Sequence, residues 1–541
     1  MVISRHGIVA TSQTLASAAG VKILEAGGSA VDAAIAANAT LGLMEPNSNG
    51  IGGDLFAIVY DAKTKKLYGL NSSGWSPAGL TIEFLKSKSN FTMPMMGIHS
   101  VTVPGAVAGW DALHSKFGRL PLSRLLQPAI HYARQGFPVT ELIAENWNSI
   151  MAKPSLTTHG NATKLYLSSG KGPVPGDLFR NPDLARSLQR IAATGKDGFY
   201  KGPIAEAIVA ISRELGGTMN LPDLAEFEAE WVEPVSTEYR GWTVTELPPN
   251  GQGIAALAML NIMEQFPIGE YGPASAKALH VMIEAKKLAY ADLLRYVGDP
   301  RFSAIPVSEM VSKELGAGRA KLIDENRASC NVVPSQLIST AKKPGADTIY
   351  LSVVDRHGNM VSFIQSNFAG FGSGVVPART GFMLQNRGGL FTMEPDQPNS
   401  LAPRKRPIHT IIPGFLSKGD TRVAFGIMGG WNQAQAHAQF VSNVVDHGMN
   451  IQAAMEAPRF TKLTFEGCDV QVESRVPEST RAELQKLGHN VRTAAPYSQN
   501  VGGGQAVMRD EKGTNFGASD PRKDGAAVPE SPQFAPAARR K

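Results

Sequence analysis

The sequence contains very little cysteine and no recurring metal-binding pattern. Only Cys330 and Cys468 occur among 541 residues, and a chain of this length buries enough apolar surface to fold without disulfides. Because the two cysteines lie far apart and fit no metal-ligand spacing, we expect two unpaired thiols. Neither a His-Glu-x-x-His nor a Cys-x-x-Cys motif is present, so the sequence predicts a protein that needs no metal and no cofactor.

Long apolar runs are also missing. The most apolar stretch, residues 31–44, is interrupted by Asp32, Asn38 and Thr40, and it is too short to span a bilayer. The first residues, MVISRHGIVATSQ, lack the apolar core of a secretory signal. We therefore expect no membrane contact and a cytoplasmic location, whereas a signal removed upstream would place the protein in the periplasm or outside the cell.

The charge distribution excludes a nucleic-acid-binding surface. The formal net charge is +6 and the isoelectric point is about 9.1, which is a weak field when it is spread over 541 residues. The densest basic run, residues 404–406, is short and lies between two prolines. It is typical of a solvated loop, so we expect a small-molecule ligand rather than a polyanion.

Helical patterns dominate the first half of the chain. Ser29 precedes an alanine-rich run with an acid in its first turn, Asp32, which predicts a capped helix. Helical periodicity returns in four further segments, at residues 104–135, 180–215, 254–265 and 275–294.

The pattern changes after residue 321. Residues 322–346 are rich in Ser, Lys, Pro and Gly without periodicity, which predicts an exposed, mobile connector. Two β-rich runs follow at 348–355 and 360–364, separated by a turn, and a second hairpin is predicted around a turn at 511–513. The Pro/Ala-rich residues 526–541 are predicted to be disordered.

Short motifs in a shared order connect these segments. They are GGSAVDAA at 27–34, VPGAVAG at 103–109, Asp347-Thr348, KRP at 405–407, Gly429-Gly430, APR at 457–459 and GASDPR at 517–522. Together they give the chain a resemblance to the γ-glutamyltransferase (glutathione hydrolase) family over nearly its whole length. The resemblance implies an α+β fold, a four-layer αββα sandwich of two antiparallel sheets flanked by helices.

The resemblance also implies that the chain cuts itself between Asp347 and Thr348. A threonine hydroxyl is a weak nucleophile that needs a neighbouring base. In these N-terminal-nucleophile hydrolases the base is the threonine's own α-amino group, whose unperturbed pKa is roughly 7.7–8.0. That amine exists only after the preceding peptide bond is broken. We therefore expect a large fragment, residues 1–347, that stays associated with a small catalytic fragment, residues 348–541.

Further roles follow from the resemblance by position. Ser366 stands where the family places a hydroxyl that contacts the nucleophile and assists cleavage. Gly429 and Gly430 match the pair whose backbone N–H groups form the oxyanion hole, which contributes a few kcal/mol to such reactions; the structural alternative is a turn that needs positive φ. Asp54 follows a glycine turn and is as consistent with a turn-capping side chain as with a site residue.

The chain departs from the family at the positions that hold the glutamyl amino acid. Ile82, Phe368 and Leu390 replace charged or polar residues there, and His409-Thr410 replaces a serine pair. These changes point to the divergent glutathione-hydrolase-like branch that includes oxamate amidohydrolase. The replacement substrate-binding set is predicted to be Gln385, Asn386, Arg387, His409 and Thr410. A guanidinium holds a carboxylate by two parallel bonds, although Arg387 in a structural ion pair and His409 as a packed core residue are the alternatives.

Three hypotheses about function remain open at this point. The leading one is a hydrolase of γ-glutamyl or related amides that acts through an acyl-threonine intermediate and favours hydrolysis over transpeptidation. The first alternative is an amidohydrolase for a small carboxylate-bearing amide such as oxamate, and kinetics on both substrates would separate the two. The second is a non-catalytic binding protein on the same fold, which would give one band on a denaturing gel instead of two. Assembly into a homo-oligomer is left open.

Overall fold

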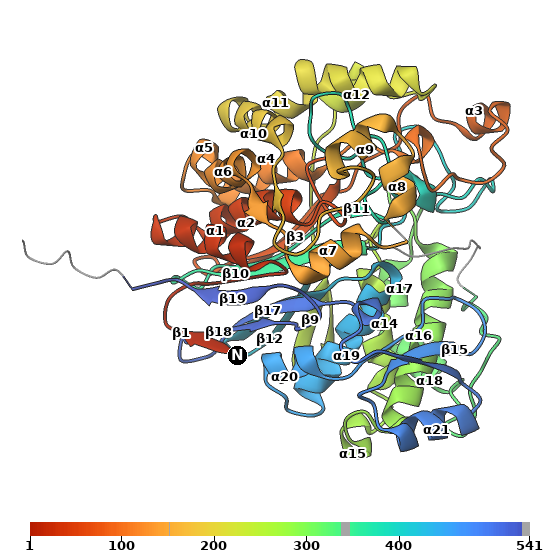
Figure 1. Cartoon of the computed structure of the whole chain (residues 1–541). Coiled ribbons are helices and arrows are strands. Elements are labelled where there is room, and N and C mark those ends of the chain that lie inside the picture. Colours follow the sequence, from red (N-terminus) through yellow and green to blue (C-terminus); the bar gives the residue numbers. More distant parts are fainter. Residues whose placement is uncertain (151, 337–346, 533–541) are drawn as a thin grey trace, which may run out of the picture.

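Two seven-stranded antiparallel sheets lie face to face between two layers of helices (Figure 1). The structure is a computed structural model that describes residues 1–150, 152–336 and 347–532. The first sheet has the order β19 (Ala526–Pro529), β2 (Ile8–Thr11), β10 (Asp347–Val354), β11 (Met360–Phe368), β3 (Asp54–Asp61), β4 (Lys66–Ser72), β7 (Glu230–Val232). The second has the order β1 (Val2–Ser4), β18 (Asn515–Ser519), β17 (Gly504–Arg509), β13 (Thr421–Ile427), β12 (Gly414–Lys418), β9 (Trp242–Glu246), β8 (Val235–Tyr239).

Side chains that alternate between the two faces of the strands form three hydrophobic cores. In β10, Ile349, Leu351 and Val353 belong to the core beneath the first helical layer, whereas Tyr350 and Val354 belong to the core between the two sheets. Successive strand side chains point to opposite faces, so a strand buried on both sides feeds two cores at once. A third core separates the second sheet from its own helices. These three cores define four layers, which confirms the predicted αββα sandwich.

The helices divide between the two outer layers. Those beside the first sheet are α1 (Thr14–Glu25), α2 (Ala30–Met44), α3 (Ile82–Ser87), α4 (Ala106–Phe117), α5 (Leu122–Leu125), α6 (Gln127–Gln135), α7 (Glu141–Trp147), α8 (Lys153–Thr157), α9 (Gly160–Tyr166), α10 (Pro182–Thr194), α11 (Asp197–Tyr200), α12 (Pro203–Glu214) and α13 (Leu221–Ala225). Those beside the second are α14 (Gly253–Met263), α15 (Ile268–Tyr271), α16 (Ala276–Tyr296), α17 (Val307–Met310), α18 (Lys313–Ala320), α19 (Gln433–Val445), α20 (Ile451–Glu456) and α21 (Glu478–Lys486).

Short elements complete the fold. They are the strand pair β5 (Phe137–Pro138) and β6 (Leu178–Phe179), the three-stranded sheet β14 (Phe460–Thr461), β15 (Asp469–Glu473) and β16 (Asn490–Ala494), and the 3-10 turns η1 (Ile98–Ser100), η2 (Arg387–Leu390), η3 (Gly430–Asn432) and η4 (Gln499–Val501). The predicted helical segments and both predicted hairpins are confirmed. Within the described ranges, no helix is long and apolar enough to cross a bilayer.

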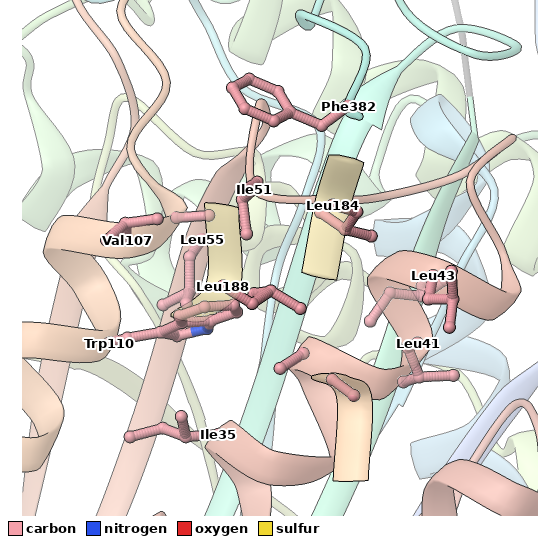
Figure 2. Packing of buried hydrophobic residues seen from close by; sticks show 14 of the residues in the cluster. Ile35, Leu41, Leu43, Ile51, Leu55, Val107, Trp110, Leu184, Leu188 and Phe382 are labelled. Carbon is pink, nitrogen blue, oxygen red and sulfur yellow. The ribbon is translucent and has the colours of Figure 1, made fainter. Parts of the chain in front are cut away.

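Helix α2 ties the outer layer to the central strands. Ser29 and Asp32 form a reciprocal capping box at its start, as the sequence predicts. At its centre, Asn38 accepts a hydrogen bond from the Trp110 indole and donates one to Gln365, both at 2.8 Å. Figure 2 shows Trp110 packed with apolar side chains from α10 and β3. This buried polar chain fixes the end of β11, where the candidate site lies.

The prediction of two unpaired thiols is wrong. Cys330 and Cys468 form a disulfide with a Cα–Cα distance of 4.8 Å across a sequence separation of 138 residues. The exposed segment that carries Cys330 lies beside the start of β15, because the N–H of Gly467 donates to the carbonyl of Cys330 at 3.0 Å. Separation in sequence did not indicate separation in space.

The predictions for the connector and for the C-terminal tail are also partly wrong. Residues 322–336 are largely exposed, as expected, but Ser335 is held by Asp292 and Tyr296 of α16; residues 337–346 lie outside the described residues. The prediction of disorder from residue 526 is wrong for 526–532. β19 pairs with β2, and the buried Glu530 carboxylate accepts a hydrogen bond from the N–H of Gly7 at 2.9 Å and pairs with Arg356. Residues 533–541 lie outside the described residues.

We expect a chain that ends at residue 525 to be less stable than one that ends at 532. The shorter chain loses the β19 ladder and the Glu530 contacts, and each lost hydrogen bond costs about 0.5–1.5 kcal/mol. Thermal unfolding of the two truncated proteins measures the difference. Equal unfolding midpoints would show that β19 does not stabilise the sheet.

Candidate active site

Thr348 lies where the central strand pair loses its regular register. The pairing of β10 with β11 shifts between Asp347 and Ile349, which is a β-bulge, a feature common beside active sites. Thr348 is 1% exposed. Its Oγ1 donates to Ser366 Oγ at 3.4 Å and accepts a hydrogen bond from Gln433 Nε2 at 3.1 Å. The structure therefore places the predicted nucleophile against the predicted assisting hydroxyl.

Gln433, which the sequence analysis missed, orients the Thr348 hydroxyl from the second sheet's side of the molecule. It is the first residue of α19, and its Oε1 accepts a hydrogen bond from the N–H of Ile412 at 3.0 Å. That contact fixes which way the amide points, so Nε2 must face Thr348. The sequence feature that could have identified Gln433 is its position as a polar residue at the start of a helix, three residues after the glycine pair.

Ser366 is held in place by two further donors. The N–H of Phe368 donates to Ser366 Oγ at 2.8 Å, and Arg387 Nη2 donates to it at 3.0 Å. Phe368 has a φ of 80°, a strained value for a non-glycine residue. A Cβ on Gly53 would lie 2.4 Å from the carbonyl oxygen of Ser366, so only glycine fits beside this part of β11.

Gly429 and Gly430 form the turn that leads into α19. Both have positive φ, 117° and 58°, as the structural alternative required. In the described ranges neither backbone N–H has a hydrogen-bond acceptor, whereas the carbonyl of Gly430 accepts from Gln252 Nε2 at 2.7 Å. The same Gln252 amide donates to the carbonyl of Thr410 at 2.5 Å. Gln252 therefore connects this turn to the segment at Thr410.

Arg387 is a fully buried cation at the edge of this cluster. Besides Ser366, it donates to Thr410 Oγ1 at 2.6 Å, and its guanidinium carbon lies 4.3 Å from the centre of the Phe368 ring. Burial lowers the pKa of Arg387 to about 9, and the charge of Asp54 opposes this shift. Its Nε is buried without a partner among the described residues. The guanidinium contacts two hydroxyls there and no carboxylate directly.

Asp54, which the sequence left open between a turn-capping side chain and a site residue, is a buried carboxylate whose charge acts on Arg387. Its Oδ1 accepts from the N–H of Gly74 and from Gln385 Nε2, both at 2.8 Å, so it caps a turn and also lies in the cluster. Burial raises the pKa of Asp54 to about 7, although Arg387 acts to lower it.

His409 is the second partner of Asp54. Its Nε2 lies 2.9 Å from Asp54 Oδ2, and its Nδ1 accepts from the N–H of Ile411 at 3.3 Å. The proton of the neutral ring is therefore on Nε2 and is donated to Asp54. Burial and the charge of Arg387 hold the pKa of His409 well below its ordinary value. His409 is thus fully buried, and both of its ring nitrogens are used in hydrogen bonds within the protein.

The remaining predicted substrate contacts differ in their surroundings. Gln385 Oε1 is buried without a partner among the described residues. In Asn386 both ends of the amide are used by the backbone, because Oδ1 accepts from Ala369 N–H at 3.0 Å and Nδ2 donates to the carbonyl of Met95 at 2.8 Å. Asn386 therefore shapes the loop around the site.

One group of side chains has the composition of a metal site, but it lies at the disulfide. Ligand atoms of His280, Glu284 and His489 come within 4.8 Å of one another. His280 and His489 are hydrogen-bonded to each other at 2.8 Å, and Lys287 donates to Glu284 at 2.6 Å. Burial and the charge of Lys287 lower the pKa of His489 to about 3. Protein partners thus already bind His280, Glu284 and one nitrogen of His489, and Lys287 connects the group to Cys468.

Comparison with known proteins gives one consistent family. The model of the gamma-glutamyltranspeptidase family matches residues 16–530. The chain is 36% identical to a glutathione hydrolase-like YwrD proenzyme of Bacillus subtilis, with 97% of this chain and 99% of that protein covered. It is 34% identical to an oxamate amidohydrolase proenzyme of Klebsiella pneumoniae, with the same coverage.

A solved structure agrees with this family. The cephalosporin acylase from Bacillus halodurans is 41% identical and superimposes with a TM-score of 0.88 over 97% of this chain and 96% of that one. These relatives are named as a hydrolase, an amidohydrolase and an acylase, and the first two are proenzymes. The chain therefore belongs to the gamma-glutamyltranspeptidase family of autoprocessing amide hydrolases.

Proposed function

We propose that this protein cuts its own chain before Thr348 and then hydrolyses an amide whose acyl group carries a carboxylate. The observation that carries the proposal is the Thr348 hydroxyl, buried between Ser366 and Gln433 at the start of β10. A nucleophile in this position has its α-nitrogen in the preceding peptide bond, so it lacks its base until that bond is cut.

In self-cleavage, Thr348 Oγ1 attacks the carbonyl carbon of Asp347. The C–N bond of that peptide breaks as an ester to the threonine oxygen forms, and the α-nitrogen takes up a proton and becomes an amine. Water then hydrolyses the ester, which ends the covalent backbone link between residues 1–347 and residues 348–541. Ser366 lies within hydrogen-bond reach of the hydroxyl and relays its proton toward the α-nitrogen as the C–N bond breaks, and Gln433 holds the oxygen in place.

In substrate hydrolysis, the new α-amine takes the Thr348 proton while Oγ1 attacks the substrate carbonyl. The N–H groups of Gly429 and Gly430, which have no acceptor in the described ranges, are the donors for the resulting oxyanion. The leaving amine takes the proton, and water releases the acyl group as an acid. We propose that water rather than an acceptor amine carries out this second step, which means hydrolysis rather than transpeptidation.

The substrate class follows from the residues around Arg387. Leu390 is buried in the apolar core of the second helical layer, and Ile82 packs against a cluster that includes the neighbouring Phe391. These side chains cannot bind the charged amino acid end of a glutamyl group. Arg387, with an unpartnered buried Nε among the described residues, is the group suited to a carboxylate. This favours a small carboxylate-bearing amide, such as oxamate, over glutathione.

We expect purified protein to contain two fragments, and the smaller one should begin at Thr348. Thr348→Ala should remain a single uncut chain without hydrolase activity, whereas Thr348→Ser should still be cut, more slowly, because a hydroxyl remains. N-terminal sequencing of the small fragment and a reducing denaturing gel measure this. Any other first residue would remove Thr348 as the nucleophile.

We expect kcat/KM to rise with pH through one ionisation near neutrality. The α-amine must be neutral to accept a proton, so activity is low below its pKa, which is roughly 7.7–8.0 when unperturbed. Asp54, with a pKa of about 7, titrates in the same range, so Asp54→Asn is the control. The rising limb should persist in that variant. If it disappears, Asp54 rather than the amine is the titrating group.

We expect Arg387→Ala to discriminate between two substrates of equal length. A charge-assisted hydrogen bond contributes about 1.5–3 kcal/mol, so kcat/KM for a carboxylate-bearing acyl anilide should fall by about 10- to 150-fold relative to its neutral isostere. Because Arg387 also contacts Ser366, a general defect would lower both rates alike and leave their ratio unchanged. An unchanged ratio would exclude Arg387 as the carboxylate-binding residue. Arg492→Ala, at an exposed position in β16, is the matched control.

A further inference from the structure

The disulfide joins two parts of the chain that lie on opposite sides of the proposed cleavage point. Cys330 precedes Asp347, and Cys468 follows Thr348. Cys330 is exposed, in a segment that follows α18, whereas Cys468 is buried immediately before β15. After a cut before Thr348, one sulfur belongs to residues 1–347 and the other to residues 348–541.

The surrounding contacts hold the two cysteines together without the help of the active site. The N–H of Ala328 donates to the carbonyl of Leu487 at 2.7 Å, and the N–H of Gly467 donates to the carbonyl of Cys330 at 3.0 Å. These bonds run between the two prospective fragments on either side of the disulfide. The sulfur atoms therefore stay close whether or not the peptide bond before Thr348 is intact.

A buried cation lies beside the sulfur of Cys468. Lys287 Nζ of α16 is 3.8 Å from Cys468 Sγ and also contacts Glu284 and the carbonyl of Ser329. An ammonium group at this distance stabilises a thiolate, the form of cysteine that reacts with disulfides. The site therefore combines an exposed residue, Cys330, with a buried one, Cys468, that lies next to a cation, and backbone hydrogen bonds join the segments that carry them.

We infer that Cys330–Cys468 is an oxidation site that covalently joins the large and small fragments after self-cleavage. The inference rests on the proposed function for the position of the cut, but the disulfide itself does not. Non-covalent packing alone would hold the fragments together only while they remain folded. The disulfide keeps them joined when the protein unfolds, so unfolding of the processed enzyme does not separate its catalytic fragment from its partner.

Formation of the bond requires an oxidant, for which a low-molecular-weight disulfide is sufficient. The Cys330 thiolate attacks one sulfur of that disulfide and releases one small thiolate. The Cys468 thiolate then attacks the Cys330 sulfur of the mixed disulfide and releases the second. Two protein thiols are oxidised and one small disulfide is reduced to two thiols, which take up the two protons.

The test compares denaturing gels of alkylated protein with and without dithiothreitol. Processed wild-type protein should migrate as one species near 57.6 kDa without reductant and as two bands with it. Cys330→Ser and Cys468→Ser should each give two bands in both lanes, and Thr348→Ala should give one band in both. Two wild-type bands without reductant, with Thr348 at the start of the smaller fragment, would overturn the inference.

Peptide mapping separates this result from failure of the proposed function. Non-reducing mass spectrometry of a proteolytic digest should yield one linked species that contains both Cys330 and Cys468, in wild type and in uncut Thr348→Ala alike. If wild type is never cut but the linked peptide is found, the proposed processing is wrong and the disulfide is right. If both cysteines are alkylated without prior reduction, the inference is overturned whatever the state of the backbone.

Discussion

In the proposed function, the site depends on one constraint: the α-nitrogen that activates the Thr348 hydroxyl is part of a peptide bond until the chain is cut. The fold meets this constraint by placing Thr348 inside the chain but at the start of the central strand β10, where the register shifts. The hydroxyl is already oriented there by Ser366 and Gln433. Ser366 comes from β11 of the first sheet and Gln433 from α19, the helix that follows β13 of the second sheet. The hydroxyl is therefore positioned only when the two halves of the sandwich are assembled.

A buried charge network surrounds this hydroxyl. Arg387 and Asp54 are both withdrawn from water, which lowers the pKa of the first to about 9 and raises that of the second to about 7. Burying charges without a close ion pair is costly, and such groups concentrate at functional sites. Arg387 reaches Thr410 and Ser366 rather than Asp54 itself. In the proposed function, the carboxylate of the substrate contacts Arg387 directly and offsets part of this cost.

Local sequence patterns predicted much of the fold but less of the site. The Ser29–Asp32 capping box and the strand pair after residue 347 are short-range features, so the chain reveals them directly. The four layers, Thr348 and Ser366 came from the family resemblance. The disulfide, the strand at 526–529 and the Gln433 contact depend on tertiary proximity. Composition also predicted disorder wrongly for residues 526–532, because this Ala/Pro-rich segment pairs with the edge of β2.

The measurement that tests this account most directly is the mass of the enzyme during turnover. Protein mixed with a slow amide substrate and quenched in acid should carry one acyl group, on the peptide that begins with Thr348. Thr348→Ala protein that is treated in the same way should carry no acyl group, although it remains folded. An acyl group found on any other residue, or steady turnover with no acyl-enzyme on Thr348 under rapid quenching, would contradict the account.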